Sequence, residues 1–304
     1  MSARIKNTVK APILVFAVFL LLLLSEQLDP VILQSGDSFY LSMIVLQFLV
    51  LVLPGYCYCR IKGNGKMTGL RLRLFSPKRL PFLFYSFGLL ITGSALVNVL
   101  MYHVFGVEAK TDVSLIPAGS ADLPSLLLVA VTFAVIPAFA EEFLFRGVLL
   151  AEYAQNGSVA ASLAVSLLFA MTHFSLRALP VYFFGGVVFA LVTYVSDSVF
   201  FAALLHMLYN LFGIFAEEYV WSLIMRPNSL VFFLFVVITL FFVFLLLTLY
   251  DAERHYRQLG MAGRESPPEE KRTYYGLRAL TDALLSPTFL ICVLFFVIVS
   301  LISG

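Results

Sequence analysis

The sequence predicts an all-α membrane protein, a polytopic bundle of eight to nine transmembrane helices. Hydrophobic residues make up 61% of the 304 residues and charged residues only 12%, about half the charged fraction of a soluble domain. Nearly charge-free windows that approach or exceed the roughly 20 residues of a bilayer-spanning helix recur along the chain. We count nine of them, at residues 11–25, 38–59, 80–102, 123–150, 158–176, 178–196, 198–216, 229–249 and 284–303. The first is short, and eight spans result if one segment lies in the membrane interface.

The charges between these windows predict a cytoplasmic N-terminus. Basic residues gather before the first window, between the second and third windows and before the last one, whereas the other charged loops are mainly acidic. Because cytoplasmic loops carry the excess of Lys and Arg, nine spans place the C-terminus outside. The net charge of +2 then faces anionic lipid and indicates no nucleic-acid partner. We expect the basic segment 60–80 to lie at the headgroup level, or else to be an ordinary basic loop.

Three charged residues stand together inside the fourth window: Glu141, Glu142 and Arg146. Each charge at membrane depth costs about 2.5–3.5 kcal/mol on insertion scales. Glu142 and Arg146 are four residues apart, so a buried ion pair on one helix face accounts for both. Glu141 lacks that local partner, and a desolvated carboxylate so placed suits a general base or acid. Pro137, just before the pair of glutamates, predicts that the helix kinks or restarts there.

Two of the four histidines, His173 and His206, fall within predicted spans, whereas His103 and His255 are expected to be solvated. Asn210 follows His206 by four residues, so both side chains lie on one helix face. Each pair taken alone is explained by an ordinary interhelical hydrogen bond. Several such polar clusters on neighbouring helices, in a chain with few other intramembrane polar groups, favour a shared site.

The register of two adjacent helices supports this convergence. The turn between them lies near Gly157, with Glu141 sixteen residues before it and His173 sixteen residues after it. In an antiparallel hairpin both side chains fall roughly 24 Å from the turn. Small residues at four-residue spacing, which permit close helix packing, follow the turn at Ser158, Ser162, Ser166 and Ala170.

These groups offer no obvious nucleophile, and the sequence contains no His-Glu-x-x-His zinc motif. A hydrolase built from them would activate water. Glu141 would take the proton, His173 would orient the water, and His206 with Asn210 would stabilise the oxyanion. The alternative from the same residues is a proton-coupled transporter, although no internal repeat of the transporter kind appears.

The three clusters resemble, in order, the motifs of the CPBP intramembrane proteases, relatives of the type II CAAX endopeptidase that trims prenylated proteins. The segment 141–147 resembles the Glu-Glu-x-x-x-Arg motif, including the small residue after the arginine. The segment 169–173 resembles Phe-x-x-x-His, and the segment 206–210 resembles His-x-x-x-Asn. Each motif is weak by itself, but the ordered set is specific. The resemblance covers about residues 120–216.

The resemblance implies the all-helical CAAX-protease bundle, typically of eight helices, and an endopeptidase acting on a membrane-associated peptide or protein. It maps catalytic positions onto Glu141, His173, His206 and Asn210, and supporting positions onto Glu142 and Arg146. We expect no cofactor, with a zinc ion on Glu141, His173 and His206 as the alternative. A non-proteolytic peptide-binding or bacteriocin-immunity relative is the further alternative.

On this interpretation the chain has three parts. They are N-terminal transmembrane helices in 1–119, which include the basic segment 60–80; a catalytic core in 120–220; and C-terminal transmembrane helices in 221–304, which include a cytoplasmic connector at 251–283.

Overall fold

The computed structural model of the chain describes residues 3–32, 37–62, 69–106, 123–216, 219, 222, 230–261 and 272–303. Every regular element within these ranges is a helix, as the composition and the apolar windows predict. The expected domain boundaries at 119/120 and 220/221 fall outside the described residues.

The helices follow one another along the chain. In order they are α1 (Ala3–Ile32), α2 (Asp37–Gln47), η1 (Phe48–Val52), α3 (Leu53–Lys62), η3 (Pro77–Arg79), α4 (Leu80–Phe105), α5 (Leu123–Ala130), η4 (Val131–Val135), α6 (Ile136–Glu142), η5 (Phe143–Leu149), α7 (Leu150–Tyr153), η6 (Ala154–Asn156), α8 (Ser158–Met171), α9 (Leu179–Ser196), α10 (Val199–Phe215), α12 (Leu230–Met261), α13 (Arg272–Leu284) and α14 (Pro287–Ser303).

Each of the nine apolar windows coincides with a helix. Among the described residues, five helices are long and apolar enough to cross a membrane: Phe39–Lys62, Pro77–Val104, Ser125–Asn156, Leu179–Ser196 and Leu230–His255. A sixth span results if Arg278–Leu284 and Pro287–Ile302, which are bent by 56° at their junction, count as one. Three further apolar helices are shorter: Lys10–Ser25, Ser158–Met171 and Val199–Phe215. The count of eight to nine crossings therefore stays a prediction.

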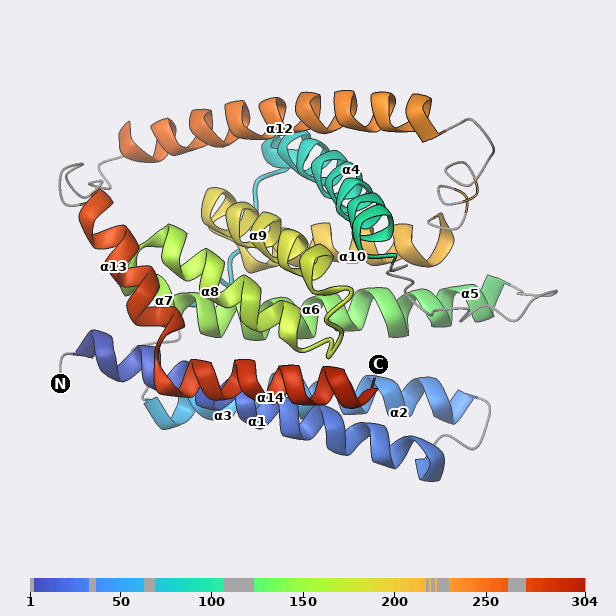
Figure 1. The fold of residues 1–304 in the computed structure, drawn as a ribbon, viewed down its shortest axis with the longest axis vertical. Coiled ribbons are helices and arrows are strands. Elements are labelled where there is room, and N and C mark those ends of the chain that lie inside the picture. The colour runs from blue at the N-terminus through green and yellow to red at the C-terminus, as the bar shows by residue number, and fades with distance from the viewer. Residues whose placement is uncertain are drawn as a thin grey trace.

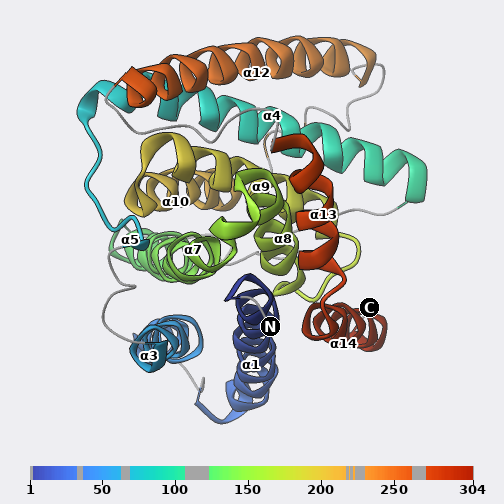
Figure 2. The same ribbon diagram turned by 90° about the vertical axis from the view of Figure 1, so that its left-hand side faces the viewer.

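The helices carrying the polar clusters lie in the middle of the bundle. In Figures 1 and 2, α12 and α4 form one outer layer, while α1, α3 and α14 form the opposite one. Between these layers lie α6, α8, α9 and α10, which pack against each other. Fully buried apolar side chains fill this middle layer, among them Leu144, Phe145, Leu168, Phe201 and Leu205. Polar groups on these helices are thus shielded on both sides.

The span that carries the glutamates is an unbroken helix, so the kink or restart expected at Pro137 is replaced by a change of helical winding. Residues 125–156 form one helical span, in which two π-helical stretches, η4 and η5, flank the short helix α6. Pro137 is the second residue of α6, where the missing backbone N–H costs little. The helix therefore continues through the proline, and the two π-helical stretches bracket Glu141 and Glu142. Such π-helical turns frequently occur at functional sites.

The described part of the basic segment, residues 69–79, docks on the turn between α9 and α10. Asp197 in this turn accepts from Arg71 Nε at 3.2 Å and from Arg73 Nη1 at 3.1 Å. The backbone N–H of Val199 donates to the Arg71 carbonyl at 3.0 Å, and the Ser198 hydroxyl donates to the Arg73 carbonyl. The segment is therefore fastened to the start of α10, and its level in the membrane stays a prediction.

The expected connector 251–283 is largely helical where it is described. Helix α12 continues past its apolar window to Met261, and α13 begins at Arg272. The pair Glu253–Arg257, at 2.6 Å and four residues apart, favours continuation of the helix. His255 was expected to be solvated, and this expectation was wrong. Both of its ring nitrogens are buried, because the ring packs 6.0 Å from that of Phe82, and neither has a partner among the described residues.

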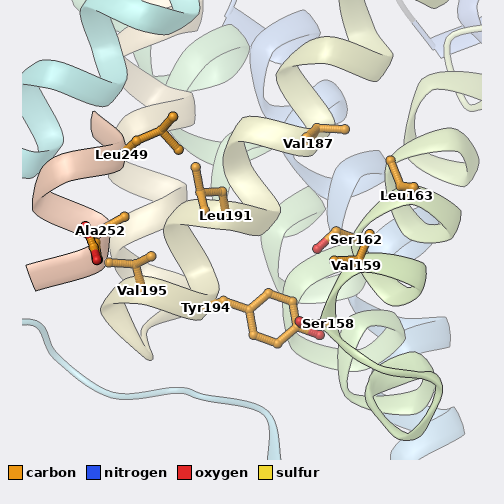
Figure 3. Close-up of a pocket in the computed structure, with 11 residues that line it drawn as sticks. Ser158, Val159, Ser162, Leu163, Val187, Leu191, Tyr194, Val195, Leu249 and Ala252 are labelled. Carbon is orange, nitrogen blue, oxygen red and sulfur yellow. The ribbon is translucent and has the colours of Figure 1, made fainter. Parts of the chain in front are cut away.

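A cavity of about 430 Å³ lies between α8, α9 and α12 (Figure 3). Its lining is mostly apolar and consists of Ser158, Val159, Ser162, Leu163, Val187, Leu191, Tyr194, Val195, Leu249, Ala252 and Glu253. The two serines are members of the small-residue row after Gly157, so this part of the row faces the cavity. None of the six candidate site residues lines it.

Candidate active site

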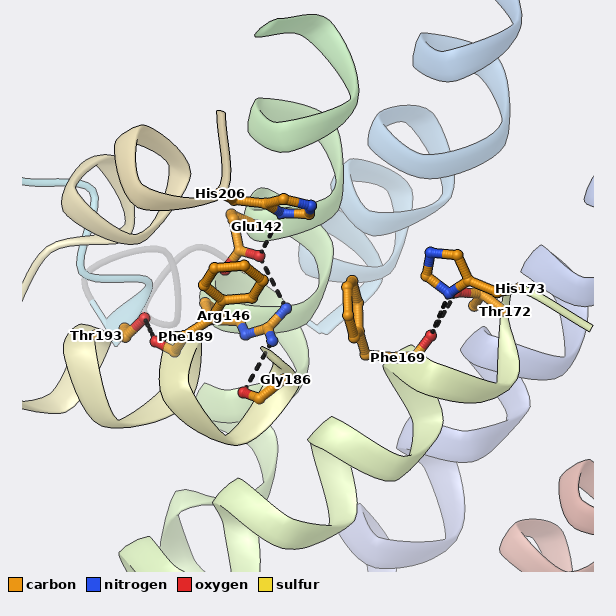
Figure 4. A network of polar contacts seen from close by, with 9 residues as sticks. All are labelled: Glu142, Arg146, Phe169, Thr172, His173, Gly186, Phe189, Thr193 and His206. Atoms are coloured by element: carbon orange, nitrogen blue, oxygen red, sulfur yellow. Dashed lines mark hydrogen bonds and ion pairs between the residues drawn. The ribbon is translucent and has the colours of Figure 1, made fainter. Parts of the chain in front are cut away.

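Glu142 joins the first polar cluster to the third. It is fully buried, and its Oε1 atom accepts from Arg146 Nη1 at 2.9 Å and from His206 Nδ1 at 3.0 Å (Figure 4). The pair with Arg146 confirms the four-residue spacing argument, whereas the contact with His206 was not foreseen. Because an ion-paired carboxylate only accepts hydrogen bonds, Nδ1 of His206 is the donor. Nε2 of His206 is left free of Glu142.

Arg146 is surrounded by groups that balance its charge. It is fully buried, and its Nη2 atom donates to the carbonyl of Gly186 on α9 at 3.0 Å. Its guanidinium carbon lies 4.6 Å from the ring centre of Phe169 and 5.2 Å from that of Phe189. Desolvated cation–π contacts of this kind contribute about 2 kcal/mol. These contacts hold Arg146 as a link between α9 and the helices that carry the glutamates and Phe169.

His173 lies just beyond the end of α8 and is fixed at one nitrogen. Its Nδ1 atom lies 3.2 Å from the carbonyl oxygen of Phe169. A carbonyl only accepts, so Nδ1 is the donor and Nε2 is free. The ring also stacks on Tyr182 of α9, with centroids 3.5 Å apart and an interplanar angle of 15°.

The second and third clusters converge around Phe169. The Phe169 ring centre lies 5.2 Å from that of His173 and 5.9 Å from that of His206. In Figure 4 the second ring nitrogen of each imidazole points toward the other across the edge of Phe169. Two motifs on different helices thus face one small region.

Glu141 stands beside this region with an unused acceptor. It is partly buried, and its Oε2 atom is buried without a hydrogen-bond partner among the described residues. The predicted turn at Gly157 is present, with φ +89°, but no hydrogen bond joins Glu141 to His173, although both residues are described. That Glu141 and His173 share one site therefore stays a prediction.

Asn210 lies on α10 one turn beyond His206. It is partly buried and makes no hydrogen bond with another described residue. Its amide is therefore unengaged in this part of the molecule. Nothing in its surroundings fixes a role for it beyond its place on the helix of His206.

The candidate zinc ligands do not gather as a ligand set. Within the described ranges, no group of three or more His, Cys, Asp or Glu side chains is placed to hold a metal ion. The set Glu141, His173 and His206 therefore does not fit a three-ligand zinc site as these side chains stand. We derive no chemical step through a metal.

Helix α9 is part of the site although none of the motifs lies on it. Tyr182, Gly186 and Phe189 contact His173, Arg146 and His206, in that order. The three positions recur at four- and three-residue intervals, which places them on one helix face. That spacing can be seen in the sequence. Aromatic residues such as Tyr182 and Phe189 in an apolar span, however, predict ordinary helix packing equally well.

Gly186 is expected to tolerate no side chain. A Cβ atom there would lie 2.9 Å from Ser166 Cβ and 3.1 Å from Ser166 Cα, and overpacking of this kind costs about 1–3 kcal/mol. We expect Gly186→Ala to lower the unfolding temperature of the purified protein in detergent. Ser166→Gly in the same chain should restore part of it.

Gly185→Ala is the matched control for this prediction. The nearest atom to a Cβ atom there is Leu90 Cδ1 at 3.6 Å, an ordinary van der Waals distance. Equal unfolding temperatures for the Gly185→Ala and Gly186→Ala proteins would contradict the close packing of α8 against α9.

Comparison with known proteins agrees with the motifs. The family model of Rce1-like type II CAAX prenyl endopeptidases matches residues 123–212, which contain all three motifs. The chain is also 26% identical over 211 residues to the membrane-embedded CAAX protease MroQ of Staphylococcus aureus (strain USA300), covering 65% of this chain and 83% of that protein. No solved structure matches the chain.

The apolar helical bundle and this family match together define a membrane-embedded peptidase, which is an integral membrane protein. Over residues 123–212 the chain is similar to the CPBP family of intramembrane proteases, in the stretch that contains the ordered motifs.

Proposed function

We propose that this protein hydrolyses a peptide bond of a membrane-associated peptide or protein by means of a water molecule that Glu141 activates. One observation carries the proposal. Glu141 keeps a buried carboxylate oxygen without a hydrogen-bond partner among the described residues and directly precedes Glu142, which holds His206, while His173 and His206 come from different helices and turn their free nitrogens toward one region. A general base, an orienting group and an oxyanion donor are the minimum set for hydrolysis without a side-chain nucleophile.

The first step forms a bond between the water oxygen and the carbonyl carbon of the substrate. Glu141 accepts one proton of the water as this bond forms. Nε2 of His173 carries no proton in the neutral ring, because Nδ1 donates to the Phe169 carbonyl. It therefore accepts the other O–H of the water and orients it. Burial of the site keeps bulk water from competing for Glu141.

The carbonyl oxygen becomes an oxyanion that His206 and Asn210 stabilise. Nδ1–H of His206 is engaged by Glu142, so Nε2 donates to the oxyanion only when the ring is doubly protonated. The Asn210 amide donates in either state of that ring. Collapse of the intermediate breaks the carbon–nitrogen bond, and the leaving amine receives the proton held by Glu141.

Cleavage in water enriched in ¹⁸O tests this mechanism. We expect a membrane-associated peptide, selected from a library with the purified protein in detergent, to gain one ¹⁸O atom in its new terminal carboxylate. No covalent adduct between peptide and protein should accumulate, because no side chain attacks the carbonyl. A trapped acyl-enzyme detected by mass spectrometry would overturn direct attack by water.

The same assay tests the zinc alternative. We expect the cleavage rate to be unchanged after treatment with EDTA, because the proposed steps use only side chains. A loss of activity that added Zn²⁺ restores would place the water on a metal ion instead.

We also propose the orientation and division of the chain that its charges and motifs favour. The N-terminus lies in the cytoplasm, and the catalytic core of 120–220 stands between N-terminal helices in 1–119 and C-terminal helices in 221–304. The bilayer is then the medium through which the substrate reaches the core.

A further inference from the structure

Helix α9 places an aromatic ring flat against each of the two site histidines. Tyr182 stacks on His173 with centroids 3.5 Å apart and planes at 15°. Phe189 stacks on His206 with centroids 4.5 Å apart and planes at 22°. The two rings are seven residues apart on α9, which is about two helical turns, so they project from one face. One rigid element thus touches both imidazoles.

Between Tyr182 and Phe189, the same face of α9 packs closely against the neighbouring helices. Gly186 lies midway and accepts the hydrogen bond of Arg146 at 3.0 Å. Its missing side chain allows Ser166 of α8 to approach to a distance that a Cβ atom would not tolerate. Phe189 is also 5.2 Å from the guanidinium of Arg146. The position of α9 relative to the histidines is therefore fixed by independent contacts.

Each imidazole needs a second contact besides its hydrogen bond. His173 is held at Nδ1 by the Phe169 carbonyl and His206 at Nδ1 by Glu142. A single hydrogen bond fixes one atom of a ring but leaves the ring free to tilt about that atom, which would move Nε2. A stacked ring restricts this tilt, because the offset or parallel arrangement is lost when the plane turns.

We propose that α9 is the positioning element of the active site, and that Tyr182 and Phe189 set the planes of His173 and His206 so that Nε2 of His173 faces the attacking water and Nε2 of His206 faces the carbonyl oxygen of the substrate. This role rests on the proposed function, in which these atoms orient the water and donate to the oxyanion. Neither aromatic ring is assigned a contact with substrate. A misplacement of about 1 Å at a reacting group lowers rates by about 100-fold, so loss of either ring should slow the chemical step.

Ring-deleting and ring-retaining variants of the same positions test the role. We expect Tyr182→Leu and Phe189→Leu to lower kcat by about 10- to 100-fold with little change in KM. Tyr182→Phe and Phe189→Tyr keep a six-membered ring and should stay within about threefold of the unmodified protein. A kcat for Tyr182→Leu equal to that of the unmodified protein, or a loss for Tyr182→Phe as large as that for Tyr182→Leu, would overturn the positioning role.

Phe184→Leu is the matched control on the same helix. Its ring lies against Gly93 of α4, away from both histidines. We expect this variant to keep its kcat, and its folded yield in detergent calibrates the packing loss caused by replacing any α9 aromatic ring. If Phe184→Leu lost as much kcat as Tyr182→Leu, the loss would come from general packing of α9 rather than from the position of the histidines. That result would overturn the proposal.

A measurement that does not use cleavage separates this inference from the proposed function. The chain has four histidines, so ¹³C-labelled histidine rings in the Glu141→Gln protein give few NMR signals, which His173→Gln and His206→Gln variants assign. Loss of a stacked ring removes its ring-current shift. We expect Tyr182→Leu to move the His173 signal alone and Phe189→Leu to move the His206 signal alone.

The outcomes are distinguishable. Unmoved signals would overturn the stacking role while leaving base catalysis by Glu141 standing. Normal cleavage by the Glu141→Gln protein would overturn the proposed mechanism, and with it the catalytic purpose of α9, even if both signals moved.

Discussion

Replacing Glu141 by Gln is expected to abolish measurable peptide cleavage while the protein stays folded and inserted. The amide has the shape of the carboxyl group but cannot accept the proton of water, and loss of a general base lowers rates by about 10²–10⁴-fold. The Oε2 atom of Glu141 has no hydrogen-bond partner among the described residues, so no observed bond at that atom is broken. Cleavage rate and unfolding temperature, measured on the same detergent preparation, check the two halves of this expectation.

Glu253→Gln is the matched control for this change. Glu253 is an exposed carboxylate on α12 that pairs with Arg257, and exposed pairs contribute little to stability. We expect cleavage at the unmodified rate in this variant. The same rate in Glu141→Gln would remove Glu141 from the role of base.

The rival functions give different results in the same assay. A peptide-binding or immunity-type relative would cleave nothing even when unmodified. A proton-coupled transporter would lose proton flux in the Glu141→Gln protein and would show no cleavage in either form.

Replacing Arg146 by Leu is expected to remove most of the folded protein. The change leaves Glu142 buried without its counter-charge, and removal of one partner from a buried ion pair costs about 3–5 kcal/mol. The Gly186 carbonyl also loses its donor, and Phe169 and Phe189 lose the cation that lies between them. The yield of monodisperse protein in detergent and its unfolding temperature measure the loss. Normal yield would contradict a structural role for the pair.

A double variant separates the buried charge from the lost volume. Glu142→Gln combined with Arg146→Leu leaves neither charge in the core, so we expect more folded protein than with Arg146→Leu alone. Cleavage should not return, because Glu142 also holds Nδ1 of His206. A double variant less stable than Arg146→Leu would show that Glu142 stabilises the fold through its contact with His206 rather than through its pair with Arg146.

Much of the helical framework was predictable because its signals are local. A charge-free window is helical whatever surrounds it, since unpaired backbone groups at membrane depth are too costly. The pair Glu142–Arg146 follows from helix geometry alone. The approach of Ser166 to Gly186 was predictable only as a tendency of small residues to permit contact.

Contacts between helices were predictable only in part, because spacing along one helix says nothing about its neighbour. The hydrogen bond from His206 to Glu142 depends on how α10 lies against α6. The share of α9 in the site depends on which of its faces meets α8. His255 was misjudged because the charges around it indicate solvent, whereas the helix carries its ring against Phe82.

The fastening of the basic segment to the α9–α10 turn has a consequence for biosynthesis. Asp197 follows Arg73 by 124 positions, so it leaves the ribosome long after the arginines. Until then, Arg71 and Arg73 lack the carboxylate of Asp197. In our proposed orientation, their positive charges keep this loop on the cytoplasmic side of the membrane. When the turn arrives, its carboxylate neutralises them and ties the loop to the helix that carries His206. In that proposed orientation, the same arginines act first as a topology signal during translation and later as an anchor of the finished protein.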